Sequence, residues 1–259
     1  MYVFVCEDSI EGILTGVYDA WDSRYGHDNI RLMVAPVINI ELFSEYITVA
    51  PNLEKSEKVR RTLIRQMGDL VYQDICHGIM SNVVEKREGI NKAEAVYRTI
   101  VYGLSMKRGE KVLEHLSDPY IATVFRLARA SHNESHHYLG FLRFKELKNN
   151  ILFSEIHPTN NIIHVLATHF ADRLPLENFI IYDDNRKVAA VHKESCDYVV
   201  VDASNIDRDA IRMFSDQEES YQRLWLGFFD NIAMTSRINP RLQSQKIPKH
   251  FWKDTVELS

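Results

Sequence analysis

The chain has 259 residues, 45% of them hydrophobic and 26% charged, and this composition is typical of a soluble globular protein. A formal net charge of −5 excludes a uniformly basic nucleic-acid-binding protein, so any contact with a polyanion would need a local cationic surface. The three cysteines form no CxxC pair, which excludes a self-contained cysteine-ligated cluster. This cysteine usage fits a reducing compartment, so we expect a cytoplasmic protein. No apolar run is long enough to span a membrane.

The first half of the sequence predicts two short strands within a largely helical region. Residues 2–6 and 30–34 are short apolar runs typical of buried strands. Asp8 or Ser9 is expected to cap the helix that follows the first strand, and Gly26 is expected to end it. Two more helices are predicted over residues 56–77 and 92–107, the second capped by Asn91.

A long helix is predicted to begin at Ser117-Asp118-Pro119, because a capping residue followed by proline is typical of a helix start. No residue interrupts the helical pattern before about Lys148, which gives roughly 30 residues and about 45 Å. The expected apolar positions of this helix are Ile121, Val124, Phe125, Ala128, Leu139 and Leu142.

The second half changes to a β-rich block over residues 151–201, in which four strand-like runs surround one helix. A C-terminal helix over residues 216–233 and an irregular basic arm complete the chain. We therefore expect one α+β domain over residues 1–259, with helices packed on a small, mostly antiparallel sheet and one long central helix. The strand near Tyr2 and the block 151–201 could contribute to the same sheet.

The segment SHNESHHYLGFLRF, residues 131–144, contains a group of histidines within the long helix. His132 and His136 are four residues apart and could share a metal, but the zincin pattern HExxH requires glutamate directly after the first histidine. Glu134 is two residues on, about 200° around the helix, and cannot serve the same ion. The sequence therefore predicts no metal and no cofactor.

The same helix carries a cationic stripe of Arg129, His132, His136 and Arg143, with Gly140 between them. The arginines and one histidine repeat every seven residues, and the glycine permits close approach of a backbone. Such a stripe suits phosphate, and we expect it to bind nucleic acid. A solvated face, or arginines paired with neighbouring acids, is the alternative.

The C-terminal arm RINPRLQSQKIPKHFWK, residues 237–253, has basic residues interleaved with aromatic ones and contains no acid. This pattern is typical of phosphate neutralisation combined with base stacking. Anchoring of the arm to the core through its aromatic residues is the alternative, and both can hold together. The candidate nucleic-acid-binding residues of the arm are Arg237, Arg241, Lys246, Lys249, His250 and Trp252.

Several other residues could carry acid–base chemistry, although no known nucleophile or phosphate-binding motif is present. His157, His164 and His169 form a third histidine group, for which packing is the alternative to ligand binding. Aspartates lie at predicted strand ends, where either catalysis or turn formation would explain them. They are Asp183, Asp184, Asp197 and Asp202.

Several stretches together resemble the bacterial DUF4130 family. They are VFVCEDSIEGILTGVYDAW, RLARASHNESHHYLGFLRFKEL, ILFSEIHPTNNIIHVLATHFADRL, FIIYDDNRKVAAVH and YQRLWLGFFDNIAMTSRINPRLQSQKIPKHFWKD. The resemblance implies a DNA-metabolism or DNA-repair protein that accompanies a radical SAM protein thought to act on DNA. In other members a similar region is fused ahead of a uracil-DNA-glycosylase domain. This chain ends soon after the last stretch and has no CxxxCxxC, so we expect a stand-alone form with neither activity.

Three hypotheses for the function follow. The first is a DNA-associated accessory protein that positions nucleic acid for a radical SAM partner enzyme. The second is a metal-independent, hydrolase-type enzyme acting on nucleic acid, which requires a histidine and an aspartate to converge in one cleft. The third is a scaffold whose basic arm docks on an acidic protein. The sequence leaves open whether the chain is catalytic.

Overall fold

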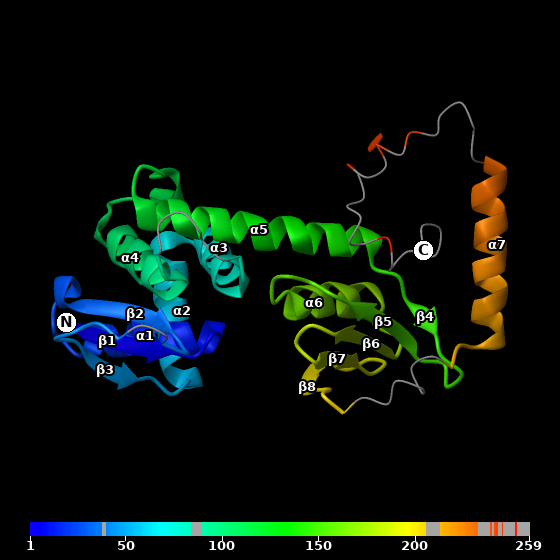
Figure 1. Ribbon diagram of the computed structural model, residues 1–259, viewed down its shortest axis with the longest axis horizontal. Helices are drawn as coiled ribbons and strands as arrows, with labels where there is room; N and C mark the ends of the chain where they lie inside the picture. The colour runs from blue at the N-terminus through cyan, green and yellow to red at the C-terminus, as the bar shows by residue number, and fades with distance from the viewer. Residues whose placement is uncertain are drawn as a thin grey trace. The chain divides into compact units, whose positions relative to one another are not determined.

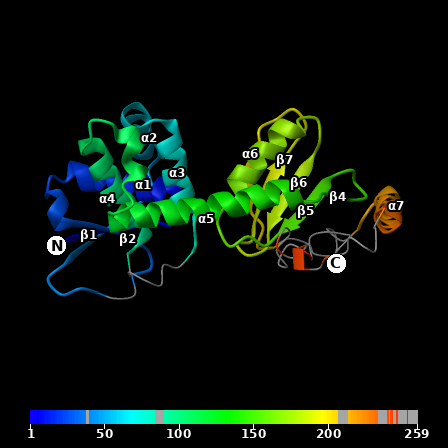
Figure 2. The ribbon, with the colours of Figure 1, turned by 90° about the horizontal axis from the view of Figure 1, so that it is seen from above.

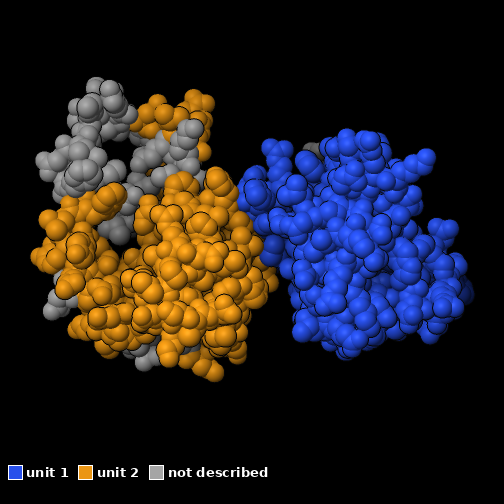
Figure 3. Space-filling model, turned by 180° about the vertical axis from the view of Figure 1, so that it is seen from behind, with its two compact units in different colours: residues 1–133 blue, residues 134–259 orange. Residues whose placement is uncertain are grey.

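The computed structural model describes residues 1–37, 40–83, 90–205 and 213–232, together with single residues near the C-terminus: 239, 241, 242, 245 and 252. The chain forms two compact units, residues 1–133 and 134–259 (Figure 3), which are described separately. The α+β class is confirmed. The prediction of one mostly antiparallel sheet is wrong, because each unit has its own sheet, one parallel and one mixed.

The sheet of the first unit has three parallel strands in the order β2-β1-β3 (Figure 1). β1 (Tyr2–Cys6) and β2 (Ile30–Val34) have the predicted bounds, whereas β3 (Glu45–Thr48) was not predicted. Because these strands pair only with each other, the expectation that Tyr2 and the block 151–201 share a sheet is wrong.

Helix α1 (Ile10–Asp22) follows β1 and is capped by the Ser9 side chain, which accepts a hydrogen bond from the backbone N–H of Gly12, as predicted. α1 crosses β1 closely at Gly16, where an added Cβ would come within 2.2 Å of Cys6 Sγ. This close approach fixes glycine at that position. The short 3-10 helix η1 (His27–Asn29) then leads into β2.

The first unit continues with the helices α2 (Leu53–Met67), α3 (Asp69–Met80) and α4 (Lys92–Ser105) and the 3-10 helix η2 (Gly109–Glu114), which precede α5. The predicted single helix over residues 56–77 is wrong, because the chain breaks at Gly68 into α2 and α3. Gly68 has a φ of +87°, a conformation that glycine adopts without strain. The prediction for α4 is confirmed, since the Asn91 side chain accepts from the Ala93 N–H.

Helix α5 (Pro119–Phe141) begins as predicted, with Asp118 Oδ1 accepting from the N–H groups of Tyr120 and Ile121. It ends at Phe141 instead of near Lys148. The Arg143 guanidinium donates back to the carbonyl oxygens of Gly140 and Leu142, and the chain then enters the next strand. Pairing with a neighbouring strand therefore overrides the helical pattern of the last predicted turns. The boundary between the two units falls inside α5.

The sheet of the second unit has five strands in the order β4-β5-β6-β7-β8. β5 and β6 are parallel and are connected through α6 (Ile163–Arg173), whereas the other neighbouring pairs are antiparallel. The strands are β4 (Lys145–Glu146), β5 (Leu152–Ile156), β6 (Phe179–Asp183), β7 (Val188–His192) and β8 (Val199–Asp202). The C-terminal helix α7 (Asp216–Ile232) agrees with its prediction.

Alternating side chains of the five-stranded sheet build two apolar layers. Phe179 and Ile181 belong to a buried cluster with α6, which lies along this face (Figures 1 and 2), and with the last turn of α5. Tyr182 and Phe153 belong to a second cluster on the opposite face. No helix among the described residues has the length and apolarity needed to cross a bilayer.

Candidate functional site

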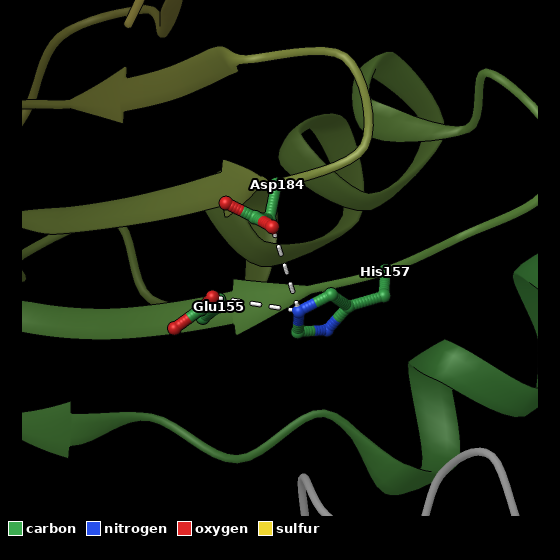
Figure 4. Close-up of side chains that lie close together, drawn as sticks. All are labelled: Glu155, His157 and Asp184. Carbon is green, nitrogen blue, oxygen red and sulfur yellow. Dashed lines mark ion pairs between the residues drawn. The ribbon is translucent and has the colours of Figure 1, made fainter. Parts of the chain in front are cut away.

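A histidine and two carboxylates come together where β5 and β6 end (Figure 4). His157 Nε2 lies 3.4 Å from Glu155 Oε1 and 3.9 Å from Asp184 Oδ2. One ligand atom from each of the three side chains lies within 4.8 Å of the others. The three side chains are 41%, 24% and 22% exposed in the order Glu155, His157 and Asp184, so the cluster is open to solvent.

The parallel pairing of β5 and β6 explains why these residues meet. Ile156 pairs with Asp183, so the residues that follow each strand, His157 and Asp184, leave the sheet at the same edge. The Asp184 N–H donates to the Ile156 carbonyl at 3.0 Å and continues the ladder beyond the strands. In sheets with parallel strands, ligands bind outside the carboxyl ends of the strands, which is where this cluster lies.

The turn that follows β6 is held by a buried ion pair. Asp183 is fully buried, and its Oδ2 accepts from Arg186 Nη1 at 2.9 Å. Its Oδ1 accepts from the N–H groups of Asn185 and Arg186. Burial raises the pKa of Asp183, and the hydrogen bonds and charge of Arg186 oppose that rise.

The same guanidinium joins this turn to the loop that carries His157. Arg186 donates to the carbonyl oxygens of Pro158 and Thr159, and Asn185 Nδ2 donates to the Pro158 oxygen at 3.0 Å. The two loops at the carboxyl ends of β5 and β6 are thus fixed to each other beside the cluster.

The C-terminal turns of α5 support the His157 loop from a third direction. The Glu134 carboxylate accepts from the N–H groups of Thr159 and Asn160, both at 2.8 Å, and from Asn160 Nδ2 at 2.7 Å. The Tyr138 hydroxyl accepts from the His157 N–H at 3.1 Å. Glu134, which the sequence analysis set apart from the helix histidines, therefore positions this loop.

The cluster has the components of an acid–base pair. A carboxylate beside an imidazole nitrogen favours the tautomer that carries its proton on that nitrogen and orients the ring, which is the arrangement of a general acid–base pair. Asp184 also pairs with Lys187, whose Nζ lies 2.6 Å from Asp184 Oδ1. The sequence analysis named His157 and Asp184 separately. It missed Glu155, whose only signal was a charge inside an otherwise apolar strand.

The predicted cationic stripe is exposed. Arg129 and His132, in the first unit, and His136, in the second, have exposed side chains on α5. Arg143 is exposed too, but it lies beyond the end of the helix and its guanidinium caps the last turn.

One neighbour of this stripe was missed. His77 on α3 lies edge-on to His132, with ring centroids 5.4 Å apart, and its Nδ1 lies 3.2 Å from Ser131 Oγ. Burial lowers the pKa of His77, the nearby His132 lowers it further, and Asp74 opposes the shift. The sequence of α3, which carries His77 in its last turn, gave no signal for this contact, because the contact depends on tertiary packing.

Most of the predicted basic arm lies outside the described residues, namely Arg237, Lys246, Lys249 and His250. Of the two remaining candidates, Arg241 is exposed and Trp252 is half-buried.

Among the described residues of unit 2, the other candidate histidines and Asp202 do not join the cluster. His164 lies against Tyr198 and His169 lies edge-on to Phe170, so the three histidines of this segment form no common site. Asp202 accepts from Ser204, which is the turn role that the sequence offered as an alternative.

The chain belongs to the DUF4130 family, because residues 91–257 match the domain of unknown function DUF4130. The match includes α5, the β5–α6–β6 segment and the Glu155–His157–Asp184 cluster, and thus confirms the family resemblance. No curated protein matches the chain significantly.

Proposed function

We propose that the protein binds nucleic acid through the cationic stripe of α5 and acts as an accessory protein in DNA metabolism or repair. The exposure of Arg129, His132, His136 and Arg143 carries this proposal. Exposed guanidinium groups bind phosphate oxygens through charge-assisted hydrogen bonds, and imidazoles add charge when protonated. The overall acidic character of the chain does not oppose this, since local patches decide the potential that a polyanion meets.

The test measures DNA binding by the double variant Arg129→Ala/Arg143→Ala, using fluorescence anisotropy over a range of salt concentrations. The variant should bind more weakly than the wild type, and the salt dependence should fall by about 0.9 in slope for each phosphate contact removed. Both side chains are exposed, so the overall fold should be retained. Arg143→Ala also removes the hydrogen bonds to Gly140 and Leu142 at the end of α5, so circular dichroism of the variant is the check on folding.

A matched control removes two exposed arginines from α2, through Arg61→Ala/Arg65→Ala. It changes the net charge by the same amount and should bind DNA like the wild type. Equal binding by the two double variants would contradict a specific role for the stripe. Salt-sensitive binding to a partner protein, without DNA binding, would support the scaffold hypothesis instead.

The basic arm is proposed as a second contact, and Trp252→Ala separates its two possible roles. Lower DNA affinity with unchanged thermal stability would support base stacking. Lower thermal stability with unchanged affinity would show that the half-buried indole anchors the arm.

The accessory role includes a radical SAM enzyme as the partner, by family resemblance. A protein that positions nucleic acid for this enzyme should raise the enzyme's affinity for DNA. The Arg129→Ala/Arg143→Ala variant should lose that effect, whereas an effect retained by the variant would separate partner binding from the stripe.

A second candidate function is a hydrolase-type activity on nucleic acid, favoured by the convergence of His157 with Asp184 and Glu155. His157 would transfer the proton, and a carboxylate would orient the ring. Hydrolysis of single- or double-stranded DNA that is lost in His157→Asn and retained in His164→Asn, an exposed histidine outside the stripe and the cluster, would support it. Activity that survives His157→Asn would exclude this residue as the general base.

A further inference from the structure

We propose that Glu155, His157 and Asp184 bind one divalent transition-metal ion, of the class of Zn²⁺ or Mn²⁺. Two carboxylates approach the same imidazole nitrogen, at 3.4 and 3.9 Å. A neutral imidazole can present only one proton at Nε2, and this proton can be shared closely with only one of the carboxylates. A dication between the three groups interacts favourably with all of them at once.

The distances fit a common ion. Ligand atoms bound tetrahedrally at about 2.1 Å lie about 3.4 Å apart. The His157–Glu155 separation of 3.4 Å matches this edge, and the His157–Asp184 separation of 3.9 Å corresponds to a wider angle at the ion. The remaining adjustment is small, because the three ligand atoms already lie within 4.8 Å of one another and the side chains are partly exposed.

The backbone that carries the ligands is held in place before any ion binds. The His157 N–H is bound by the Tyr138 hydroxyl, and the Asp184 N–H by the Ile156 carbonyl. Arg186 ties the loops after the two strands together. Hydrogen bonds of this kind hold the metal-binding residues in a fixed orientation and thereby strengthen metal binding.

The ligand set indicates the class of ion. One imidazole nitrogen with two carboxylate oxygens suits zinc, manganese and neighbouring divalent ions, whereas magnesium and calcium prefer oxygen alone. Among the residues that the structure describes, three protein ligands come together, and their exposure leaves coordination positions for water or substrate. This is the arrangement of a catalytic site, not of a closed structural one.

The metal site does not depend on nucleic-acid binding by α5. It deepens the second candidate function, since a bound ion lowers the pKa of its water and thereby supplies a nucleophile for hydrolysis. Metal binding is measured without DNA, so a failure of the metal site can be distinguished from a failure of the proposed action on nucleic acid.

The test is titration of the metal-free full-length protein with Zn²⁺ by calorimetry, and with Co²⁺ by visible absorption. The wild type should bind one ion per chain, with Zn²⁺ at least tenfold tighter than Mg²⁺. His157→Asn and Asp184→Asn should each lower the affinity at least tenfold and remove the cobalt spectrum. The matched control His136→Asn removes an exposed histidine of the same unit and should bind like the wild type.

Lys187→Met should change the Zn²⁺ affinity in the opposite direction, towards tighter binding. Its ammonium competes with an ion for Asp184, at 2.6 Å in the ion pair, so its removal should raise the Zn²⁺ affinity severalfold. The proposal is overturned if the wild type binds no ion, if His157→Asn and His136→Asn bind equally well, or if Mg²⁺ binds as tightly as Zn²⁺. Circular dichroism of each variant confirms folding, and Asp184→Asn, which keeps the side-chain shape, decides the question if His157→Asn does not fold.

Discussion

Replacement of Arg186 by methionine should destabilise the second unit by about 3 kcal/mol. Asp183 is fully buried, and the Arg186 guanidinium provides its opposite charge at 2.9 Å. Methionine keeps most of the apolar stem of the side chain but removes the charge and its donors. The carboxylate is then left in a buried position without a cation, and the link to the Pro158 and Thr159 carbonyl groups is lost.

The magnitude follows from what Asp183 retains. Removal of one partner of a buried ion pair costs about 3–5 kcal/mol. Asp183 Oδ1 keeps two backbone donors, the N–H groups of residues 185 and 186, at 3.0 and 3.1 Å. These amides stabilise the anion after the substitution, which places the expected loss near the lower end of the range.

The assay is urea unfolding of the wild type, Arg186→Met, Asp183→Asn and the double variant. Because the two side chains interact directly, the double variant should lose at least about 1 kcal/mol less than the sum of the single losses. Lys187→Met is the matched control on the same turn. Its ion pair with Asp184 is 41% exposed on the lysine side and screened by solvent, so Lys187→Met should lower the stability clearly less than Arg186→Met.

Two results would refute this reasoning about Arg186. One is a loss in Arg186→Met no larger than that in Lys187→Met, which would mean that burial of the pair adds nothing. The other is strict additivity in the double variant, which would show that the destabilisation comes from the carbonyl contacts and not from the charge on Asp183.

Three other predictions concern separate parts of the molecule. Glu134→Gln should lower stability by about 1.5–3 kcal/mol in urea unfolding, since the amide loses charge-assisted bonds to the His157 loop. Under native conditions a thiol reagent should modify Cys196, which is exposed, before Cys6 and Cys76, whose pKa values burial raises to about 12 and about 11. Stability should fall as the pH drops below about 6.5, and less so in His77→Asn, because the lowered pKa of His77 lets the unfolded chain bind more protons.

Each of these has a result that would contradict it. A loss in Glu134→Gln equal to that in Glu177→Gln, an exposed control, would mean that the loop does not depend on the carboxylate. Fast modification of all three thiols would mean that the first-unit core opens readily. If the stability of His77→Asn falls with decreasing pH as steeply as that of the wild type, other groups cause the loss of stability at low pH.

Local signals in the sequence predicted the individual elements well. Ser9, Asn91 and Asp118 cap helices through their own side chains, which is a property of a few consecutive residues. The helix break at Gly68 and the end of α5 at Phe141 were not predicted. In both cases the helical pattern continues in the sequence, and a backbone conformation or strand pairing set by the tertiary structure ends the helix.

The candidate site was predictable only in its parts. His157 and the strand-end aspartates were recognised as residues that can carry out acid–base chemistry. Their convergence, however, depends on the relative direction of β5 and β6. The predicted sheet was mostly antiparallel, and in an antiparallel pair the residues after the two strands would lie at opposite ends of the sheet. The parallel crossover through α6 brings them to the same edge instead.

Asp183 and Asp184 are consecutive residues at the end of β6, but the first stabilises the turn and the second belongs to the candidate site. Successive side chains at the end of a strand point to opposite sides. Asp183 therefore enters the interior, where Arg186 and two amides satisfy it and fix the turn, whereas the 22% exposed Asp184 reaches the imidazole of His157. The buried residue makes the geometry rigid and the exposed one is available to a ligand. Exchange of the two environments would need a shift of register, so variants at Asp183 should act on stability and variants at Asp184 on binding.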